Sequence, residues 1–132
     1  MQAMDQNARA FYEQQLRLSF FQRREDEFQG FFSSIMEMRY TNDFQRVRPW
    51  GNMGDQKNDG YLRSSKKLFQ IYAPFKISAA ATIKKIDEDY HGALPHWRTF
   101  YTTWVFVHND MNGLPAPILK KLLGLGKLTP GL

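Results

Sequence analysis

Apolar residues recur at helical spacing near the start of the chain. Between residues 25 and 40, five of them follow the i, i+3, i+4, i+7, i+8 pattern of a helix that packs one face against a core: Phe28, Phe31, Phe32, Ile35 and Met36. Acidic residues at 25–27 fall in the first turn of this helix, where the helix dipole favours them. A less regular apolar stripe predicts an earlier helix from Asp5 to about Gln22.

The rest of the chain alternates strand and helix signals. The expected elements follow in order: a strand at 44–48 that ends before Pro49, hairpin strands at 58–62 and 68–72, a helix at 79–91 capped by Ser78, a strand at 99–107 and a helix at 115–123. This order, α-α-β-β-β-α-β-α, predicts one α/β (α+β) domain over residues 1–123, with a central mixed sheet flanked by helices. Residues 124–132 are expected to form a flexible tail that links to a further C-terminal region.

The expected hairpin brings an acid and an amide together. Its bend falls at residues 64–65, so paired residues have numbers that sum to 129, and Asp59 lies opposite Gln70. Opposed side chains on one face have Cβ atoms about 4.5 to 5.5 Å apart, close enough to share a divalent metal. An acid and a second oxygen donor beside basic residues indicate a metal-dependent phosphodiesterase. Residues 58–60 also form a turn signature, and Gln70 is alternatively a hydrogen-bonded core amide.

Composition narrows the class of protein. The chain has 132 residues, enough for one domain with a single core, and aromatic residues make up 15% of it, which argues against disorder. It contains no cysteine, which excludes disulfides and thiol nucleophiles. No apolar run approaches the roughly 18 to 20 residues that span a bilayer, and the first residues lack signal-peptide features. The expectation is a soluble cytoplasmic domain with no membrane partner.

The net charge of +5 is concentrated in one segment. Residues 39–76 carry eight basic residues against three acidic ones, and the remainder carries ten of each sign. Such a basic patch favours a polyanion as partner, above all a nucleic acid. The alternatives are a solvated, charged hairpin and a surface that meets an acidic protein.

Three motifs then suggest a family. They follow one another along the chain: Glu27-Phe28-Gln29-Gly30-Phe31-Phe32 running on to Glu37, Gly54-Asp55-Gln56-Lys57-Asn58-Asp59-Gly60, and Gln70-Ile71-Tyr72. Together with the order of elements, they resemble the restriction-endonuclease-like PD-(D/E)XK superfamily, most of all its Mrr-type branch, the type IV restriction nucleases. The resemblance covers residues 25–107, the expected core of the domain. Similar domains occur in multi-component bacterial defence systems.

The resemblance implies a role for each motif residue. Asp59 would be the metal-binding aspartate, Gln70 would occupy the (D/E) position, and Glu37 would be an outer acid of the same magnesium site. The departure is Tyr72, which stands where the family has a lysine that positions the attacking water and stabilises the charge developing on the phosphoryl group. A tyrosine, with an ordinary pKa of about 10, brings no positive charge near neutral pH.

The sequence therefore predicts a nuclease-fold domain that acts on or senses duplex DNA in a bacterial anti-phage or restriction-type defence system. Magnesium-dependent hydrolysis is expected to be weak or lost, unless Lys57 across the hairpin or Lys84 on the next helix replaces the missing lysine. The candidate catalytic residues are Asp59, Gln70, Tyr72 and Lys57. The residues expected to contact phosphate groups are Arg46, Arg48, Lys57, Arg63, Lys66 and Lys67.

A rival interpretation keeps the fold without the chemistry. In it the chain is a catalytically inactive DNA-binding or protein-interaction module of a larger assembly, with other protein subunits or a C-terminal domain as partners. A homodimer is a further candidate, because many nucleases of this fold cut duplexes as dimers.

Overall fold

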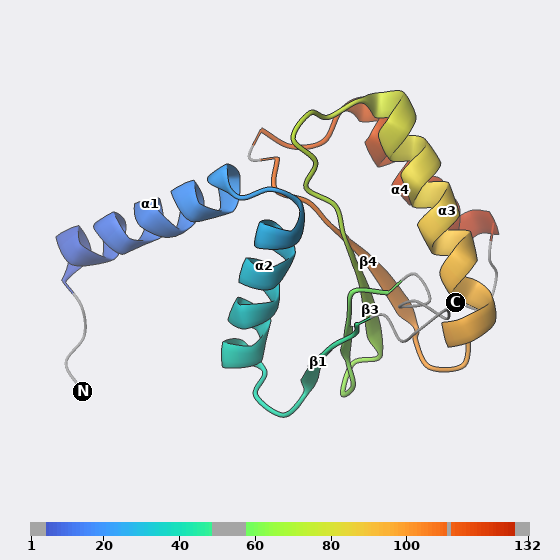
Figure 1. Cartoon of the computed structure of the whole chain (residues 1–132), viewed down its shortest axis with the longest axis horizontal. Helices are drawn as coiled ribbons and strands as arrows, with labels where there is room; N and C mark the ends of the chain where they lie inside the picture. Colours follow the sequence, from blue (N-terminus) through green and yellow to red (C-terminus); the bar gives the residue numbers. More distant parts are fainter. Residues whose placement is uncertain (1–4, 49–57, 111, 129–132) are drawn as a thin grey trace.

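The chain forms a four-stranded sheet with helices on both faces (Figure 1). The computed structural model describes residues 5–48, 58–110 and 112–128, with side chains through residue 125. Its elements are α1 (Gln6–Gln22), α2 (Glu25–Arg39), β1 (Phe44–Arg46), β2 (Gly60–Leu62), β3 (Lys67–Ile71), α3 (Ala79–Trp97), β4 (Thr103–Val107) and α4 (Ala116–Leu128). The predicted mixed α/β class and order of elements are confirmed.

The strands lie in the order β1-β2-β3-β4. The first three form an antiparallel meander, and β4 runs parallel to β3 after the α3 crossover. In the hairpin Gly60 pairs with Phe69 and Tyr61 with Leu68, so the predicted register, in which numbers sum to 129, is confirmed.

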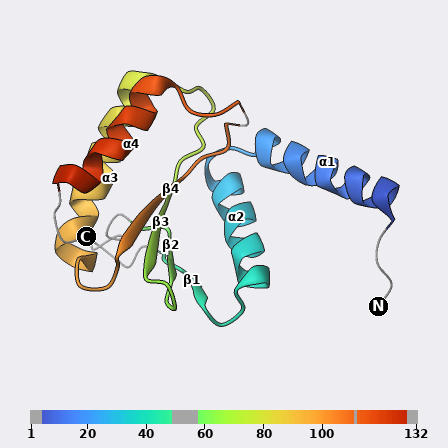
Figure 2. The ribbon, with the colours of Figure 1, turned by 180° about the vertical axis from the view of Figure 1, so that it is seen from behind.

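Alternate residues of β3 face different helices. Leu68 packs against Ala93 of α3 on one face of the sheet. Phe69 packs against Phe32 of α2 on the other face, with the two ring centroids 5.8 Å apart. Figure 2 shows the same arrangement from behind, with α2 on one side of the sheet and the α3–α4 pair on the other. Strand alternation therefore places Gln70 on the α3 side, next to the end of β2.

The pairing of β1 with β2 depends on a glycine. A Cβ added to Gly60 would lie 2.5 Å from Cζ of Phe44, which is buried and leads the opposite strand. Phe44 makes edge contacts with Phe32 and Phe69, so its ring has little room to move. The glycine directly after Asp59 is therefore a packing requirement of the sheet.

Two helices run further than predicted. The sequence pattern predicted that the crossover helix ends at His91, whereas α3 continues through Gly92 and Pro95 to Trp97. The final helix was predicted to stop at 123, whereas α4 reaches Leu128. Leu125 is buried against Ile86 and Ile118, and this packing outweighs the cost of about 1 kcal/mol for each glycine inside a helix. The expected tail therefore begins as ordered helix.

Helix α1 stands away from the body of the domain (Figures 1 and 2). Its N-terminus is capped by Asp5, whose Oδ1 accepts from the Ala8 amide at 2.8 Å. The helix has no buried residue, and Phe20 near its end packs against Phe28 of α2. Among the described residues, no helix combines the length and hydropathy that crossing a bilayer requires.

Candidate metal and nucleic-acid site

The predicted pair of Asp59 and Gln70 is in direct contact. Oδ2 of Asp59 accepts from Nε2 of Gln70 at 2.9 Å and from the backbone amide of Ile71 at 2.8 Å. Oδ1 accepts from Nε2 of Gln29, on α2, at 3.4 Å. Both Asp59 and Gln70 are buried, with 7% and 6% of their surface exposed. The carboxylate is thus held from both sides of the sheet.

This carboxylate lies where the β2 ladder stops. The amide of Tyr72 donates to Val107 on β4, so the preceding amide, that of Ile71, points toward β2. Strand β2 begins at Gly60, and the side chain of Asp59 supplies the acceptor that a further strand residue would otherwise provide. Asn58 adds a local turn, because its Oδ1 accepts from the Gly60 amide at 3.0 Å. The sequence left two interpretations of residues 58–60, a turn and an acid paired with Gln70, and the structure contains both.

The Gln70 amide is oriented as a donor to Asp59. Among the described residues, its buried Oε1 has no hydrogen-bond partner, and the same is true of Nδ2 of Asn58, next to Asp59. For Gln70 to offer Oε1 to a cation beside Asp59, the amide would have to turn over and give up its bond to the carboxylate.

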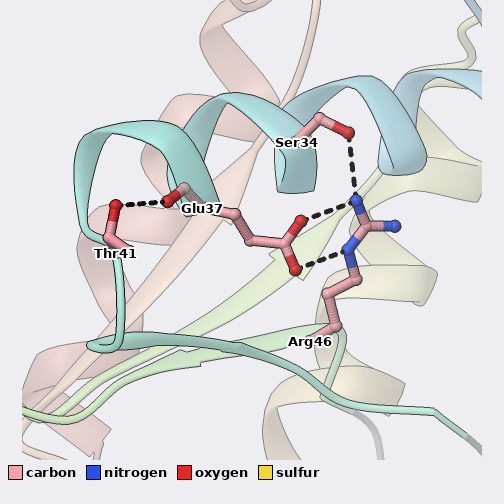
Figure 3. A network of polar contacts seen from close by, with 4 residues as sticks. All are labelled: Ser34, Glu37, Thr41 and Arg46. Atoms are coloured by element: carbon pink, nitrogen blue, oxygen red, sulfur yellow. Dashed lines mark hydrogen bonds and ion pairs between the residues drawn. The ribbon is translucent and has the colours of Figure 1, made fainter.

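Glu37 is engaged elsewhere. Its two oxygens accept from Nε and Nη2 of Arg46 at 2.9 and 2.8 Å, and Nη2 also donates to Ser34 at 3.0 Å (Figure 3). The hydrogen bond with Glu37 raises the pKa of Arg46 above its ordinary value. Glu37 follows Gln29 by eight residues, about 12 Å along the helix. The structure therefore gives it an ion pair in place of the expected position beside Asp59.

Asp59 opens onto a cleft of about 290 Å³ between α2 and the end of β1. Its other lining residues are Asp26, Gln29, Gly30, Ser33, Arg46, Val47 and Arg48. The four from α2 share one helical face, with the spacing i, i+3, i+4, i+7. Sequence reasoning missed Asp26 and Gln29, although this spacing on the polar face of a predicted helix is a signal that could have found them.

The six predicted phosphate contacts do not gather in one place. Arg46 and Arg48 line the cleft with Asp59. At the opposite end of the hairpin, Arg63 donates to the Asn42 carbonyl at 2.7 Å, and Lys66 adopts a left-handed conformation with φ 52° in the turn. The exposed Lys67 follows that turn. Lys57 lies outside the described residues.

Tyr72 turns toward β4. Its ring packs against Phe106, with centroids 6.0 Å apart, and lines a pocket beyond the ends of β3 and β4. Lys84, the alternative source of an ammonium group, is exposed and lies 3.9 Å from Glu88 on α3. Within the described part of the chain, no lysine lines the Asp59 cleft, and no three His, Cys, Asp or Glu side chains gather as a metal site would require.

Helix α3 holds a second buried acid. Asp89 is 1% exposed, and its carboxylate oxygens lie 3.1 Å from the ammonium of Lys85, one turn earlier. The sequence did not single it out, because a lysine followed four residues later by an acid is ordinarily a solvated surface pair.

Comparison of the chain with protein-family models, curated proteins and solved structures found no match. The resemblance to the restriction-endonuclease-like superfamily therefore stays a prediction.

Proposed function

We propose that the chain is a nuclease-fold domain that binds or senses DNA with weak or lost hydrolysis, in a restriction-type or anti-phage defence system. The observation that carries the proposal is the Asp59–Gln70 pair at the edge of a cleft lined by Arg46 and Arg48. The meander followed by a helix and a parallel strand supports it, because this is the order that resembles the superfamily.

The donor set fits magnesium poorly. Magnesium favours anionic oxygens, and the Asp59–Gln70 pair offers one formal negative charge. Oδ2 of Asp59 already accepts two N–H groups, and Gln70 presents its amide nitrogen to that oxygen. Glu37, the expected outer acid, neutralises Arg46. The pair therefore holds the edges of β2 and β3 together.

The position of Tyr72 supports loss of hydrolysis. Its ring packs on Phe106, with centroids 6.0 Å apart, and it brings no positive charge to the site. Loss of one transition-state donor typically costs about 100- to 1000-fold in rate. Binding without cleavage is the activity that this arrangement favours.

Of the two cleft arginines, Arg48 is the better suited to a phosphate backbone. Nε and Nη2 of Arg46 already donate to Glu37 and Ser34, and the ion pair neutralises its charge. Arg48 is exposed at the same cleft. DNA binding that relies on such contacts weakens with salt, with a slope of about −0.9 in log affinity per phosphate neutralised.

The test is duplex binding across a salt series, followed by fluorescence anisotropy. Wild type should bind with a negative salt slope, and Arg48→Glu should weaken binding and flatten the slope. Lys84→Glu, which changes charge by the same amount on the exposed face of α3, is the matched control and should have a smaller effect. Absence of salt-dependent binding in the wild type, or equal effects of the two variants, would remove the proposal.

A second candidate, a protein-interaction module that pairs with its own copy, rests on α1. This helix exposes Phe11 and Tyr12 at 57% and 59% together with Leu16, and exposed apolar side chains gathered on one helix are typical of a contact with another protein. Sedimentation velocity of the wild type and of Phe11→Asp would test it. A monomer at all concentrations would exclude this candidate.

A further inference from the structure

A second pocket lies just outside the carboxyl ends of the parallel strands β3 and β4. Its volume is about 160 Å³, and its walls include Tyr72, Phe106 and His108. The space beyond the carboxyl ends of parallel strands is where open α/β sheets commonly bind ligands. The proposed DNA-binding surface around Asp59 does not use this pocket.

The walls are aromatic and already ordered. The rings of Phe106 and His108 are nearly parallel, with an interplanar angle of 24° and centroids 6.5 Å apart, and Tyr72 is tilted by 36° against Phe106. Nδ1 of His108 accepts from the Asp110 amide at 3.1 Å, which leaves the ring proton on Nε2. Burial lowers the pKa of His108, so the ring is a neutral donor near neutral pH.

Backbone and side-chain bonds hold the pocket open. The Glu25 amide donates to the Ala73 carbonyl at 2.7 Å and ties α2 to the end of β3. Nδ2 of Asn109 donates to the carbonyls of Phe20 and Arg23, at 3.0 and 2.6 Å, and ties the end of β4 to the α1–α2 junction. The walls are therefore fixed before any ligand arrives.

Among the described residues, the lining also includes exposed apolar side chains, one cation, Arg24, and one acid, Asp110. Phe75 is 77% exposed, and Phe21 and Ile77 are also exposed at the mouth of the pocket. Arg24 lies at the same mouth, with its guanidinium 5.4 Å from the centroid of the Phe21 ring. An exposed apolar rim around a preformed pocket is typical of a ligand site.

The size selects the ligand. A protein cavity of about 150 Å³ holds one benzene molecule, so this pocket has room for a single six-membered ring. The Tyr72 hydroxyl and Nε2–H of His108 give such a ring hydrogen-bonding partners, which an aliphatic side chain could not use. Arg24 at the mouth suits an anionic backbone attached to the ring.

A smaller cleft connects the linings of the pocket and of the Asp59 cleft. Tyr72 and Pro74 line both the pocket and this smaller cleft, which shares Asp26 and Gln29 with the Asp59 cleft. The three hollows are therefore neighbours on the surface of the domain.

We propose that this pocket takes one unpaired pyrimidine base of a DNA strand, stacked among Phe75, Phe106 and Tyr72, while the backbone follows the connected clefts toward Arg48. The inference rests on the proposed DNA binding and adds the chemical part of DNA that the domain recognises. Stacking on aromatic side chains requires an unpaired base, so a single strand or an opened duplex is the expected form.

The test compares three short single strands by fluorescence anisotropy: oligothymidylate, oligoadenylate and a strand of abasic residues with the same number of phosphates. Oligothymidylate should bind tightest and the abasic strand about tenfold or more weaker. Phe75→Ala should weaken oligothymidylate binding by about tenfold and leave the abasic strand unaffected. The matched control is Phe100→Ala, which removes an exposed ring that contacts Trp97, at the opposite end of α3 from Thr82, which lines the pocket.

The outcomes separate this inference from the proposed function. Equal affinity for thymidylate and abasic strands, or no effect of Phe75→Ala, overturns the base pocket and leaves salt-dependent DNA binding standing. A preference for oligoadenylate also overturns it. Failure of all three single strands to bind overturns it too, and the duplex salt series then decides separately whether the proposed function stands.

A second measurement needs no phosphate contact. Thymidine alone, added to the full chain at millimolar concentration, should shift the NMR signals of the His108 and Tyr72 rings. If N-acetyltyrosine amide shifts those signals and thymidine does not, the pocket takes a side chain of a protein partner and the inference is wrong.

Discussion

Asp59 is the residue on which the candidate site and the fold both depend. Its carboxylate accepts from a backbone amide and from two side-chain amides of different elements. An acid that serves only as a metal ligand usually lies close to other acids, and their repulsion destabilises the fold. Asp59 is instead surrounded by hydrogen-bond donors. The residue therefore acts first as a lock between β2, β3 and α2.

Asp59→Asn should consequently destabilise the protein by about 1 to 3 kcal/mol, because buried donors lose a charged acceptor. Urea unfolding at neutral pH measures the change. Asp26→Asn, in the same cleft but exposed, is the control and should change stability by less than about 0.5 kcal/mol. If the Asp59 variant were as stable as the wild type or more stable, the main role of Asp59 would be to bind a cation.

A second acid gives the hairpin turn a pH dependence. Ser64 donates to Asp43 through its hydroxyl at 2.5 Å and its backbone amide at 2.8 Å, and these bonds lower the pKa of Asp43 below its ordinary value of 3.8. A carboxyl whose folded pKa is depressed stabilises the fold above its unfolded pKa. That contribution is lost as the pH falls from about 4 through the folded pKa.

The Ser64→Ala variant should therefore show an Asp43 pKa closer to 3.8 than the wild type does, measured by NMR titration of the side-chain carboxyl. It should also lose less stability than the wild type on acidification below about pH 4. Ser65→Ala, at the neighbouring exposed position, is the control and should leave the Asp43 pKa as it is. An unaltered pKa in Ser64→Ala would show that the serine hydroxyl is not its main cause, and would leave the backbone amide of residue 64 and Arg63 as the causes.

At the scale of elements, the hairpin was predictable and the helix contacts were not. The register of β2 and β3 follows from the position of the bend, a local feature, so the Asp59–Gln70 contact could be read from the chain. The approach of Gln29 to Asp59 depends on how α2 packs across the sheet, which spacing alone does not determine. The same holds for Glu37, whose ion pair with Arg46 forms only after α2 and β1 meet.

The pairing of β1 with β2 gives a prediction for two glycine variants, whose effects on stability should have opposite signs. Gly60→Ala should destabilise by about 1 to 3 kcal/mol, because the added methyl group would lie 2.5 Å from Cζ of Phe44 in a packed cluster. Gly30→Ala, within α2, meets no atom within 4 Å and should stabilise by about 0.5 to 1 kcal/mol. Thermal unfolding of both variants measures the difference. If the two variants shifted stability in the same direction, close packing at β1 would not be the reason for Gly60.

At the scale of the whole molecule, two neighbouring surfaces differ in their chemistry. The Asp59 cleft faces α2 and carries arginines beside acids. The aromatic pocket lies beyond the parallel strands, and Tyr72 is part of its wall. A lysine at position 72 would exchange an aromatic wall for a charge, so the substitution that departs from the nuclease pattern is also the one that completes the pocket.

This coupling predicts what restoring the nuclease pattern would do. Isolated wild type should show little or no magnesium-dependent nicking of supercoiled DNA, and magnesium should leave its melting temperature unchanged. In the wild type, Nε2 of Gln70 lies 2.9 Å from Oδ2 of Asp59. In a Gln70→Glu, Tyr72→Lys variant, the carboxylates at positions 59 and 70 would face each other at about this distance. Their repulsion should lower the melting temperature, and millimolar magnesium should restore it, because a ligand that binds only the folded state stabilises it.

The same double variant should gain partial nicking activity and lose affinity for oligothymidylate, since the lysine removes a ring from the pocket. Adding Asp59→Ala to it provides the control, which should abolish both the magnesium effect and the nicking. Vigorous cleavage by the wild type, abolished by Asp59→Ala, would contradict this prediction and would mean that a lysine from another part of the chain completes the site.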